Sequence, residues 1–152
     1  MWGLQVQERE AIIKELWRRI ASVSGVAYTA RNPKAPPNVT DFPAIQFFEL
    51  GDSVEDTQKR GTQVAYKRKL DVVVEMFIAA TTEASATNEL MEIYLPRLKT
   101  ALYLGGPTLG RLCSFKENGT SRILRPPVGE NSIGIGLQLQ IRYVEDVNLL
   151  FI

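Results

Sequence analysis

The feature that most constrains this chain is a long stretch of alternation between residues 63 and 79. The even positions are apolar and most charges fall on odd ones; the apolar set is Val64, Tyr66, Leu70, Val72, Val74, Met76 and Ile78, and the charged set is Lys67, Lys69, Asp71 and Glu75. A period of two is typical of a β-strand. Strands usually span about five or six residues, so one this long can extend past its own domain. We expect its even face to pack on a core and its odd face to meet solvent or another subunit.

A second alternation covers the stretch "SIGIGLQLQIRYVED" near the end of the chain. Its apolar face consists of Ile133, Ile135, Leu137, Leu139, Ile141 and Tyr143. Gly134 and Gly136 lie on the other face, where the missing side chains allow another backbone to approach closely. That neighbour could be a helix of the same chain or another chain, and the sequence leaves both open.

Two segments have the period of an amphipathic helix. In residues 7–25, Ile12, Ile13, Leu16, Trp17 and Ile20 form an apolar stripe opposite charged residues. In residues 81–106, the stripe is formed by Leu90, Tyr94, Leu98 and Leu102. Pro96 interrupts this second pattern, so it should kink the helix or begin a new helix in its first turn.

The remaining segments predict shorter extended elements. "VAYTAR" reads as a short strand, and "DFPAIQFFE" reads as a strand with apolar residues on both faces that reaches solvent at Glu49. The polar stretch of residues 51–62, bounded by two glycines, predicts the tip of a hairpin. Asn118-Gly119 predicts a second hairpin, between two short strands. The order of elements predicts an α+β fold. We expect a single-domain sandwich over residues 1–152, with a mostly antiparallel sheet and two main helices packed on one face.

The composition argues against most enzyme and membrane classes. There is no histidine, and Cys113 is the only cysteine, so one chain cannot build a Ser-His-Asp or Cys-His triad. No apolar run approaches the ~20 residues that span a bilayer, and no signal peptide is expected. The net charge of +1 argues against general binding to duplex nucleic acid. We expect no catalytic residue, no cofactor, no metal and no membrane.

Carboxylates are the remaining route to chemistry. They scatter over predicted turns without the spacing of a known metal loop, at Asp41, Asp52, Glu55, Asp56, Glu130 and Asp146. Because acidic residues are common in turns for backbone reasons, a structural role is favoured. A small metal-dependent enzyme that uses Asp41 and Glu49 is kept as an alternative.

Two further features predict an interaction surface. Positive charge concentrates on the predicted hairpin and the base of the long strand, at Lys59, Arg60, Lys67, Arg68 and Lys69. This is either a solvated hairpin whose lysines block unwanted pairing or a contact with an acidic partner or nucleic acid. The C-terminal stretch 146–152 ends in an apolar run that either packs on its own domain or contacts a partner. The candidate interface residues are Lys59, Arg60, Lys67, Lys69, Leu149, Leu150, Phe151 and Ile152.

The order of segments resembles the tail terminator proteins of long-tailed phages and related contractile particles. The resemblance rests on "REAIIKELWRRIASVSGV", "DFPAIQFFE", "YKRKLDVVVEMFIA", "ATNELMEIYLPRLKTAL" and a closing "IRYVED", and it covers nearly the whole chain. It implies a small structural subunit that forms a ring, usually a hexamer. The family has no catalytic signature from which single residues could be assigned.

The resemblance also implies a place and a set of partners. The ring would cap the tail tube at the neck end of the virion, stop polymerisation and join the head, after assembly in the host cytoplasm. Its partners would be its own copies, the tail tube protein, a head-closure or neck protein and, in a contractile tail, the sheath protein. DNA would only pass through the lumen. Another neck component, such as a head-closure or connector subunit, is the nearest alternative.

Overall fold

The structure is a computed structural model that describes residues 2–79, 83–104, 114–118, 122–124 and 132–148. Its helical elements are α1 (Trp2–Ala21), the 3-10 turn η1 (Val39–Asp41), α2 (Glu83–Glu89), the π-helical turn η2 (Leu90–Tyr94) and α3 (Leu95–Leu102). Its strands are β1 (Tyr28–Arg31), β2 (Ala44–Arg60), β3 (Gln63–Ala79), β4 (Ser114–Glu117), β5 (Arg122–Leu124) and β6 (Ser132–Asn148).

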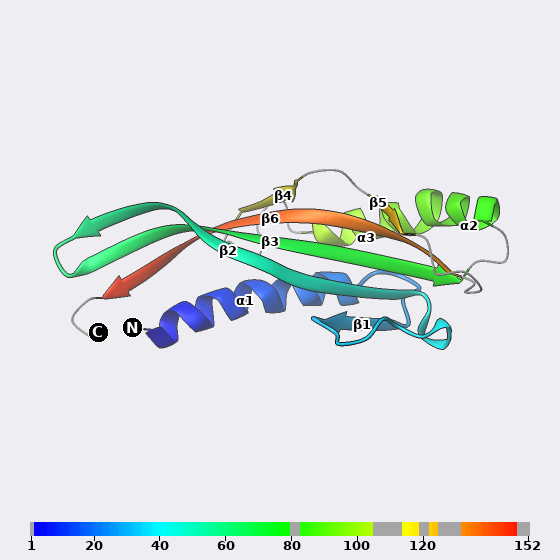
Figure 1. Ribbon diagram of the computed structural model, residues 1–152, viewed down its shortest axis with the longest axis horizontal. Coiled ribbons are helices and arrows are strands. Elements are labelled where there is room, and N and C mark those ends of the chain that lie inside the picture. The colour runs from blue at the N-terminus through cyan, green and yellow to red at the C-terminus, as the bar shows by residue number, and fades with distance from the viewer. Residues whose placement is uncertain (1, 80–82, 105–113, 119–121, 125–131, 149–152) are drawn as a thin grey trace.

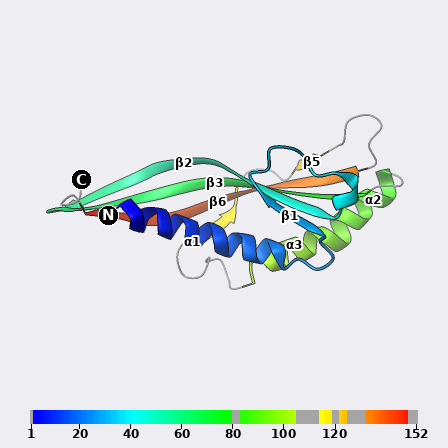
Figure 2. The ribbon, with the colours of Figure 1, turned by 90° about the horizontal axis from the view of Figure 1, so that it is seen from below.

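One sheet organises the chain, with the strand order β1-β2-β3-β6-β4 and β5 also paired with β6. Its centre is a ribbon of three long antiparallel strands, β2, β3 and β6. β1 adds to β2 in parallel, and β4 and β5 both add to the other side of β6. The helices α1, α2 and α3 lie along one face of this sheet (Figures 1 and 2). The predicted α+β class and mostly antiparallel sheet are confirmed. The two main helices predicted on one face are also confirmed: one is α1, and the other is the continuous segment formed by α2, η2 and α3.

The core lies between that helical layer and the sheet. Ile12, Ile13, Leu16 and Ile20 of α1 are fully buried, as the period predicted. From the sheet they meet the alternating sets of β3 and β6, where Val72 lies beside Leu139 and Val74 beside Leu137. The even face of β3 therefore packs on the core, as predicted. We call this side of the sheet the helix face and the other side the open face.

Pro96 begins a new helical segment rather than a simple kink. α2 passes into the π-helical turn η2, in which the N–H of Leu95 bonds to the carbonyl of Leu90, and α3 starts there with Pro96 in its first turn. A proline has no N–H to donate and is tolerated in the first turn of a helix. The second of the two predicted outcomes is therefore the one observed.

The hairpin predicted at residues 51–62 is present, but its tip is much shorter than predicted, because most of this stretch is strand. β2 continues to Arg60 and pairs with β3 as far as Gln63, with bulges at Leu50 and Glu55. Only two residues, Gly61 and Thr62, form the turn, and Gly61 has a positive φ of 58°, which glycine adopts without strain. The backbone pairing needs no apolar side chains, so the polar sequence concealed the strand.

The predicted hairpin at Asn118-Gly119 is also wrong. β4 and β5 do not pair with each other; Phe115 of β4 lies beside Ile141, and Ile123 of β5 lies beside Ile135. Both short strands therefore extend the same edge of β6 at successive positions along it.

Gly134 of β6 makes room for a neighbouring strand of the same chain. A Cβ on Gly134 would lie 2.6 Å from Cδ1 of Phe77 and 2.8 Å from the carbonyl oxygen of Met76. Phe77 is the direct cross-strand neighbour of Gly134, and its ring stacks on Phe42 at 6.1 Å. The close neighbour is thus the β3 strand on the open face, and neither a helix nor a second chain is needed to explain Gly134.

Candidate interaction surface on the three-stranded arm

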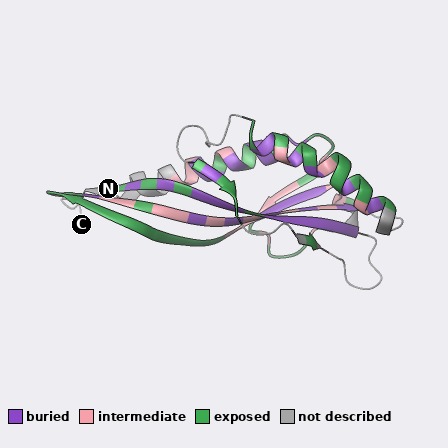
Figure 3. Cartoon of the chain, turned by 90° about the horizontal axis from the view of Figure 1, so that it is seen from above, coloured by how far each residue is buried: buried purple, intermediate pink, exposed green. Residues whose placement is uncertain are grey.

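The ribbon of three long strands continues past the apolar core and projects from the rest of the molecule (Figures 1 and 2). We call this projection the arm; it comprises residues 52–60 of β2, 63–70 of β3 and 141–148 of β6, which are paired except at the Glu55 bulge. At its base, Leu70, Ile141 and Tyr143 still belong to the apolar core. Along the arm β2 is exposed at every residue, whereas the same strand is buried in the body from Ala44 to Phe47 (Figure 3). An over-long strand that extends past its own core was the first prediction from the sequence, and the arm confirms it.

Within the described part of the chain, the outer strand edges are covered in the body and bare in the arm. β1 covers β2 only from Ala44 to Phe47. On the opposite side, β5 covers β6 at residues 134–136 and β4 covers it at 139–142. Among the described residues, no strand pairs with the outer edge of β2 beyond these positions, nor with β6 beyond Arg142. Bare edges present unpaired N–H and C=O groups to which another strand can add.

A network of charges holds the base of the arm against α1 and β1 on the helix face. Its centre is Glu49, whose side chain is 7% exposed. Arg31 donates to it through Nε at 2.8 Å, and Asn32 donates through Nδ2 at 2.7 Å. Arg9 of α1 lies 3.2 Å from the same carboxylate. Burial by itself would raise the pKa of Glu49, but the hydrogen bonds from Arg31 and Asn32 and the nearby charges hold it below its usual range.

The same network continues outward across all three strands of the arm. The hydroxyl of Tyr143 donates to Asp52 at 2.6 Å, so that β6 is tied to β2 across β3. Burial, reinforced by this bond, raises the pKa of Tyr143 above its usual value. Arg68 of β3 lies 2.9 Å from Glu145 and 3.5 Å from Asp52. Polar contacts therefore replace apolar packing on the helix face where the core ends.

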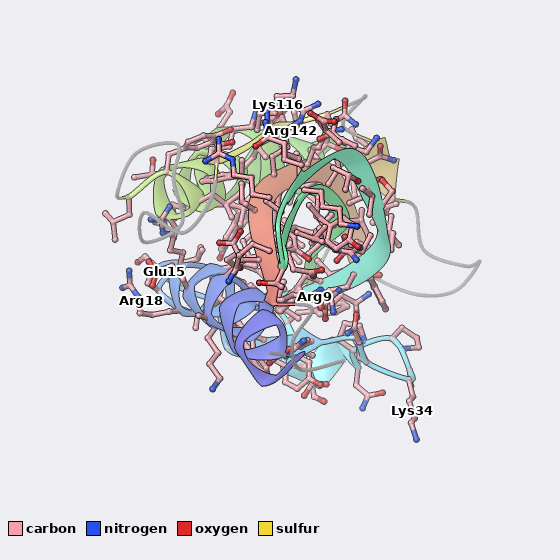
Figure 4. The ribbon with its side chains drawn as sticks, turned by 90° about the vertical axis from the view of Figure 1, so that its left-hand side faces the viewer. Arg9, Glu15, Arg18, Lys34, Lys116 and Arg142 are labelled. Carbon is pink, nitrogen blue, oxygen red and sulfur yellow. The ribbon has the colours of Figure 1, made fainter. Side chains whose placement is uncertain are left out.

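The open face of the arm carries a second group of charges. Arg142 donates to Glu55 through Nε at 2.8 Å and through NH2 at 3.3 Å. Lys69 is the cross-strand neighbour of Arg142, and Lys116 and Arg142 lie together on the same side of the molecule (Figure 4). The hydrogen bonds from Arg142, opposed by slight desolvation and aided by the charges of Arg142, Lys69 and Lys116, lower the pKa of Glu55.

The predicted interface residues divide into two groups. Lys59, Arg60, Lys67 and Lys69 all lie on the arm, where the first three are exposed and Lys69 is half-buried. The predicted concentration of positive charge is present, but Glu55 and Asp56 lie beside it, and Lys67 is the direct neighbour of Asp56. The other four, Leu149, Leu150, Phe151 and Ile152, lie outside the described residues.

Most of the carboxylates considered for chemistry have structural partners where they are described; Asp146 has no ion-pair partner among the described residues. Glu49 was predicted to reach solvent; this is wrong, because β1 and α1 cover it with cations. Asp52, predicted to mark a turn, lies within β2 opposite Leu70. Asp41 accepts a bond from the backbone N–H of Asn38 at 3.0 Å. Within the part of the chain that the structure describes, no three His, Cys, Asp or Glu residues gather as a possible metal site.

Sequence reasoning missed Arg142, Glu145 and the role of Asp56 and Asp146. The two aspartates were assigned to turns, yet both lie in strands of the arm. The available signal was the continued alternation of β6 through "IRYVED", which places Arg142, Val144 and Asp146 on one face.

Comparisons with known proteins identify a fold rather than a family. No protein-family model matches the chain, and no curated protein sequence matches it. Its fold is similar to that of a chain in the solved structure of the virion of a native gene transfer agent (GTA) particle. The TM-score is 0.50 with 17% sequence identity, over 90% of this chain and 94% of that chain. At this identity the likeness shows a shared fold over nearly the full length of both chains.

None of the helices in the described part of the chain has the length and apolar character needed to cross a membrane.

Proposed function

We propose that the protein is a structural subunit of a phage-type virion: a tail terminator that closes into a ring on the end of the tail tube. The ring, a hexamer, stops tube polymerisation and offers the surface to which the head joins. The protein is not an enzyme and needs no cofactor. It is found at the neck end of the tail, after assembly in the host cytoplasm.

The observation that carries this proposal is the arm, on whose two outer edges no strand of the described residues pairs. Natural sheets cover or shorten their edges because an exposed edge invites another chain, and this sheet covers both of its edges in the body with β1, β4 and β5. Leaving the same edges bare over the arm favours a subunit that is completed by other chains. Because the two edges differ in sequence, contact between them is heterologous, which is the kind of contact that generates rings.

Two further lines support a virion role. The fold is similar to that of a chain in a gene transfer agent virion, and the order of segments resembles that of tail terminators. The partners that follow are further copies of this chain, the tail tube protein, a head-closure or neck protein and, in a contractile tail, the sheath protein. DNA only passes through the lumen.

The mechanism we propose is capping. The ring seats on the last ring of tube subunits and occupies the growing end with a surface that a further tube ring cannot use. The opposite surface of the ring then joins the head through the neck protein. No covalent bond is made or broken in this process, so it requires complementary surfaces and not a reactive side chain.

The test is assembly without the protein. Particles assembled in its absence should have tails of abnormal length without attached heads, and adding the purified protein should restore uniform tails that join heads. Tails of normal length in its absence would contradict the terminator role. Labelled protein located by electron microscopy at the head end of closed heads, and not on isolated tails, would instead favour a head-closure or connector subunit.

A further inference from the structure

The bare edges of the arm have regular backbone geometry where they could pair. On β2, the last bulge is at Glu55, and from Asp56 to Arg60 the pairing with β3 is uninterrupted. On β6, the pairing with β3 is uninterrupted from Ser132 to Asn148. On the outer side of β6, the pairing with β4 reaches Arg142 and goes no further. A shallow hollow lined by Ser114, Arg142 and Val144 among others lies beside the first residue of β4. Each edge therefore offers about one regular strand length of five residues.

The direction of pairing follows from the topology. β2 and β6 are both antiparallel to β3, so they run parallel to each other. A second copy placed beside the first in the same orientation brings its β2 edge alongside the β6 edge in a parallel sense. Such an arrangement repeats from copy to copy, because each copy still has one edge of each kind to offer.

The charges of the two edges fit one register. When residue 58 of one copy lies opposite residue 144 of the next, the open-face neighbours on the bare edges are Gln58 with Val144 and Arg60 with Asp146. The pairing stops short of Arg142, because Ser114 of β4 already lies beside it. Among the described residues, neither Arg60 nor Asp146 has an ion-pair partner within its own chain, whereas Arg142 binds Glu55.

The same register also matches the helix face. It places Lys59 of one copy beside Glu145 of the next, and Thr57 beside Tyr143. Glu145 is 8% exposed, and its Oε1 is buried without a hydrogen-bond partner among the described residues. A buried acceptor without a donor is costly. An incoming lysine ammonium on that face supplies the missing donor.

Other registers fit less well. Antiparallel pairing about the same centre sets Asp56 opposite Asp146, and like charges directly opposite each other destabilise a strand pair. Sliding the parallel strand by two residues in either direction, which keeps the faces matched, leaves Glu145 and Asp146 opposite uncharged residues or the turn. Only the first register satisfies the charges of both faces.

We propose that copies of this protein join by parallel addition of the β2 edge of one arm, residues 57–60, to the β6 edge of the next, residues 143–146. This inference rests on the proposed function, since it names the contact that closes the ring. The sheet then continues from copy to copy, with Arg60 bound to Asp146 and Lys59 bound to Glu145 across each junction.

The test mixes two variants that carry opposite changes. Arg60→Asp alone places Asp opposite Asp146 at every junction, and Asp146→Arg alone places Arg opposite Arg60. Replacing an opposite-charge pair by a like-charge pair should weaken each junction about tenfold, so neither variant alone should form the wild-type oligomer. In an equimolar mixture every junction between unlike copies regains an Asp–Arg pair, and native mass spectrometry should show oligomers of alternating composition. A pairing within one chain could not be restored by mixing.

Controls separate this result from misfolding and from charge alone. Lys34→Asp changes a charge of the same sign at a site far from Arg142 (Figure 4), and it should leave assembly unchanged. Circular dichroism melts should show both arm variants folded. If wild-type rings form and each arm variant assembles as well as wild type, this register is wrong while the terminator role stands.

Cysteine cross-linking covers the case of weak association. Neighbouring strands lie about 4.8 Å apart, within the distance that a disulfide spans. In a Cys113→Ser background, Gln58→Cys on one chain should cross-link to Val144→Cys on another, and Lys34→Cys should not. Wild-type protein that stays monomeric at high concentration, together with no cross-link above the Lys34→Cys level, overturns the inference. The tail-length assay still tests the proposed function separately.

Discussion

Glu49→Gln is the most direct test of what holds the arm to the body. The change keeps the size of the side chain but removes its charge and turns one acceptor into an N–H2 donor. In the structure both carboxylate oxygens accept, one from Arg31 Nε and Asn32 Nδ2 at 2.8 and 2.7 Å, and the other from Arg31 NH2 at 3.1 Å. In the glutamine variant, one of these sets of donors must face another donor.

The size of the stability loss depends on how far the ion pair is buried and on the ion pair with Glu10 that Arg31 keeps. Removing one partner from a fully buried ion pair costs about 3–5 kcal/mol. Arg31 here is 23% exposed and keeps Glu10, to which NH2 donates at 2.7 Å. We therefore expect a loss of about 2 kcal/mol in the free energy of unfolding. For a chain of this size, that loss lowers Tm by about 4–8 °C.

The assay is urea unfolding of wild type and variant, at a concentration where both have the same oligomeric state. The midpoint should fall at an unchanged slope, because the surface exposed on unfolding is the same. Glu55→Gln is the matched control: it removes a carboxylate that also binds an arginine in a bidentate manner, but the Glu55 and Arg142 side chains are 34% and 46% exposed. Its midpoint should not change measurably. Equal losses in the two variants would refute the argument that burial makes the Glu49 network matter.

Two further predictions concern packing and acid stability. Gly134→Ala should destabilise the protein by about 1–3 kcal/mol in urea unfolding, because its methyl group would overlap Phe77, whereas Gly51→Ala, with open space around the added methyl, should be neutral. Hydrogen bonds from Arg18, opposed by burial and aided by Arg19, lower the pKa of Glu15 to about 2. Since this folded-state pKa lies below the ordinary value of 4.5, the stabilisation is complete above pH 4.5 and is lost as pH falls toward 2. The stability difference between wild type and Glu15→Gln should shrink over that interval; a constant difference would contradict it.

The sequence predicted the elements whose side chains alternate against a core. α1, β3 and β6 were predicted from the period of their apolar residues, and Pro96 marked the break between η2 and α3. In each case one face of the element is buried, so local sequence records the three-dimensional environment. These elements determine the fold class.

Sequence patterns failed to predict strands that are held by backbone hydrogen bonds and have no buried apolar face. The outer half of β2 has solvent on both faces, so nothing in its side chains distinguishes it from a loop. β4 and β5 were predicted to pair with each other because Asn118-Gly119 is a local turn signal, but the long edge of β6 offered both a partner. The burial of Glu49 depends on Arg9 and Arg31 from distant parts of the chain, which no local pattern encodes.

The charges of the arm sort by face and by edge. On the helix face, Glu49, Asp52 and Arg68 have partners within the chain, and they fix how the arm leaves the body. At the outer strand edges, Arg60 and Asp146 have no ion-pair partner among the described residues, and these two residues carry opposite charges. A one-residue slip in the pairing would turn every side chain to the other face. The edge strand must therefore be held in a fixed direction for the junction to form in one register. The internal network therefore supplies the rigidity that the proposed junction requires. Loosening it with Glu49→Gln should weaken assembly even though Glu49 does not lie on the paired edges.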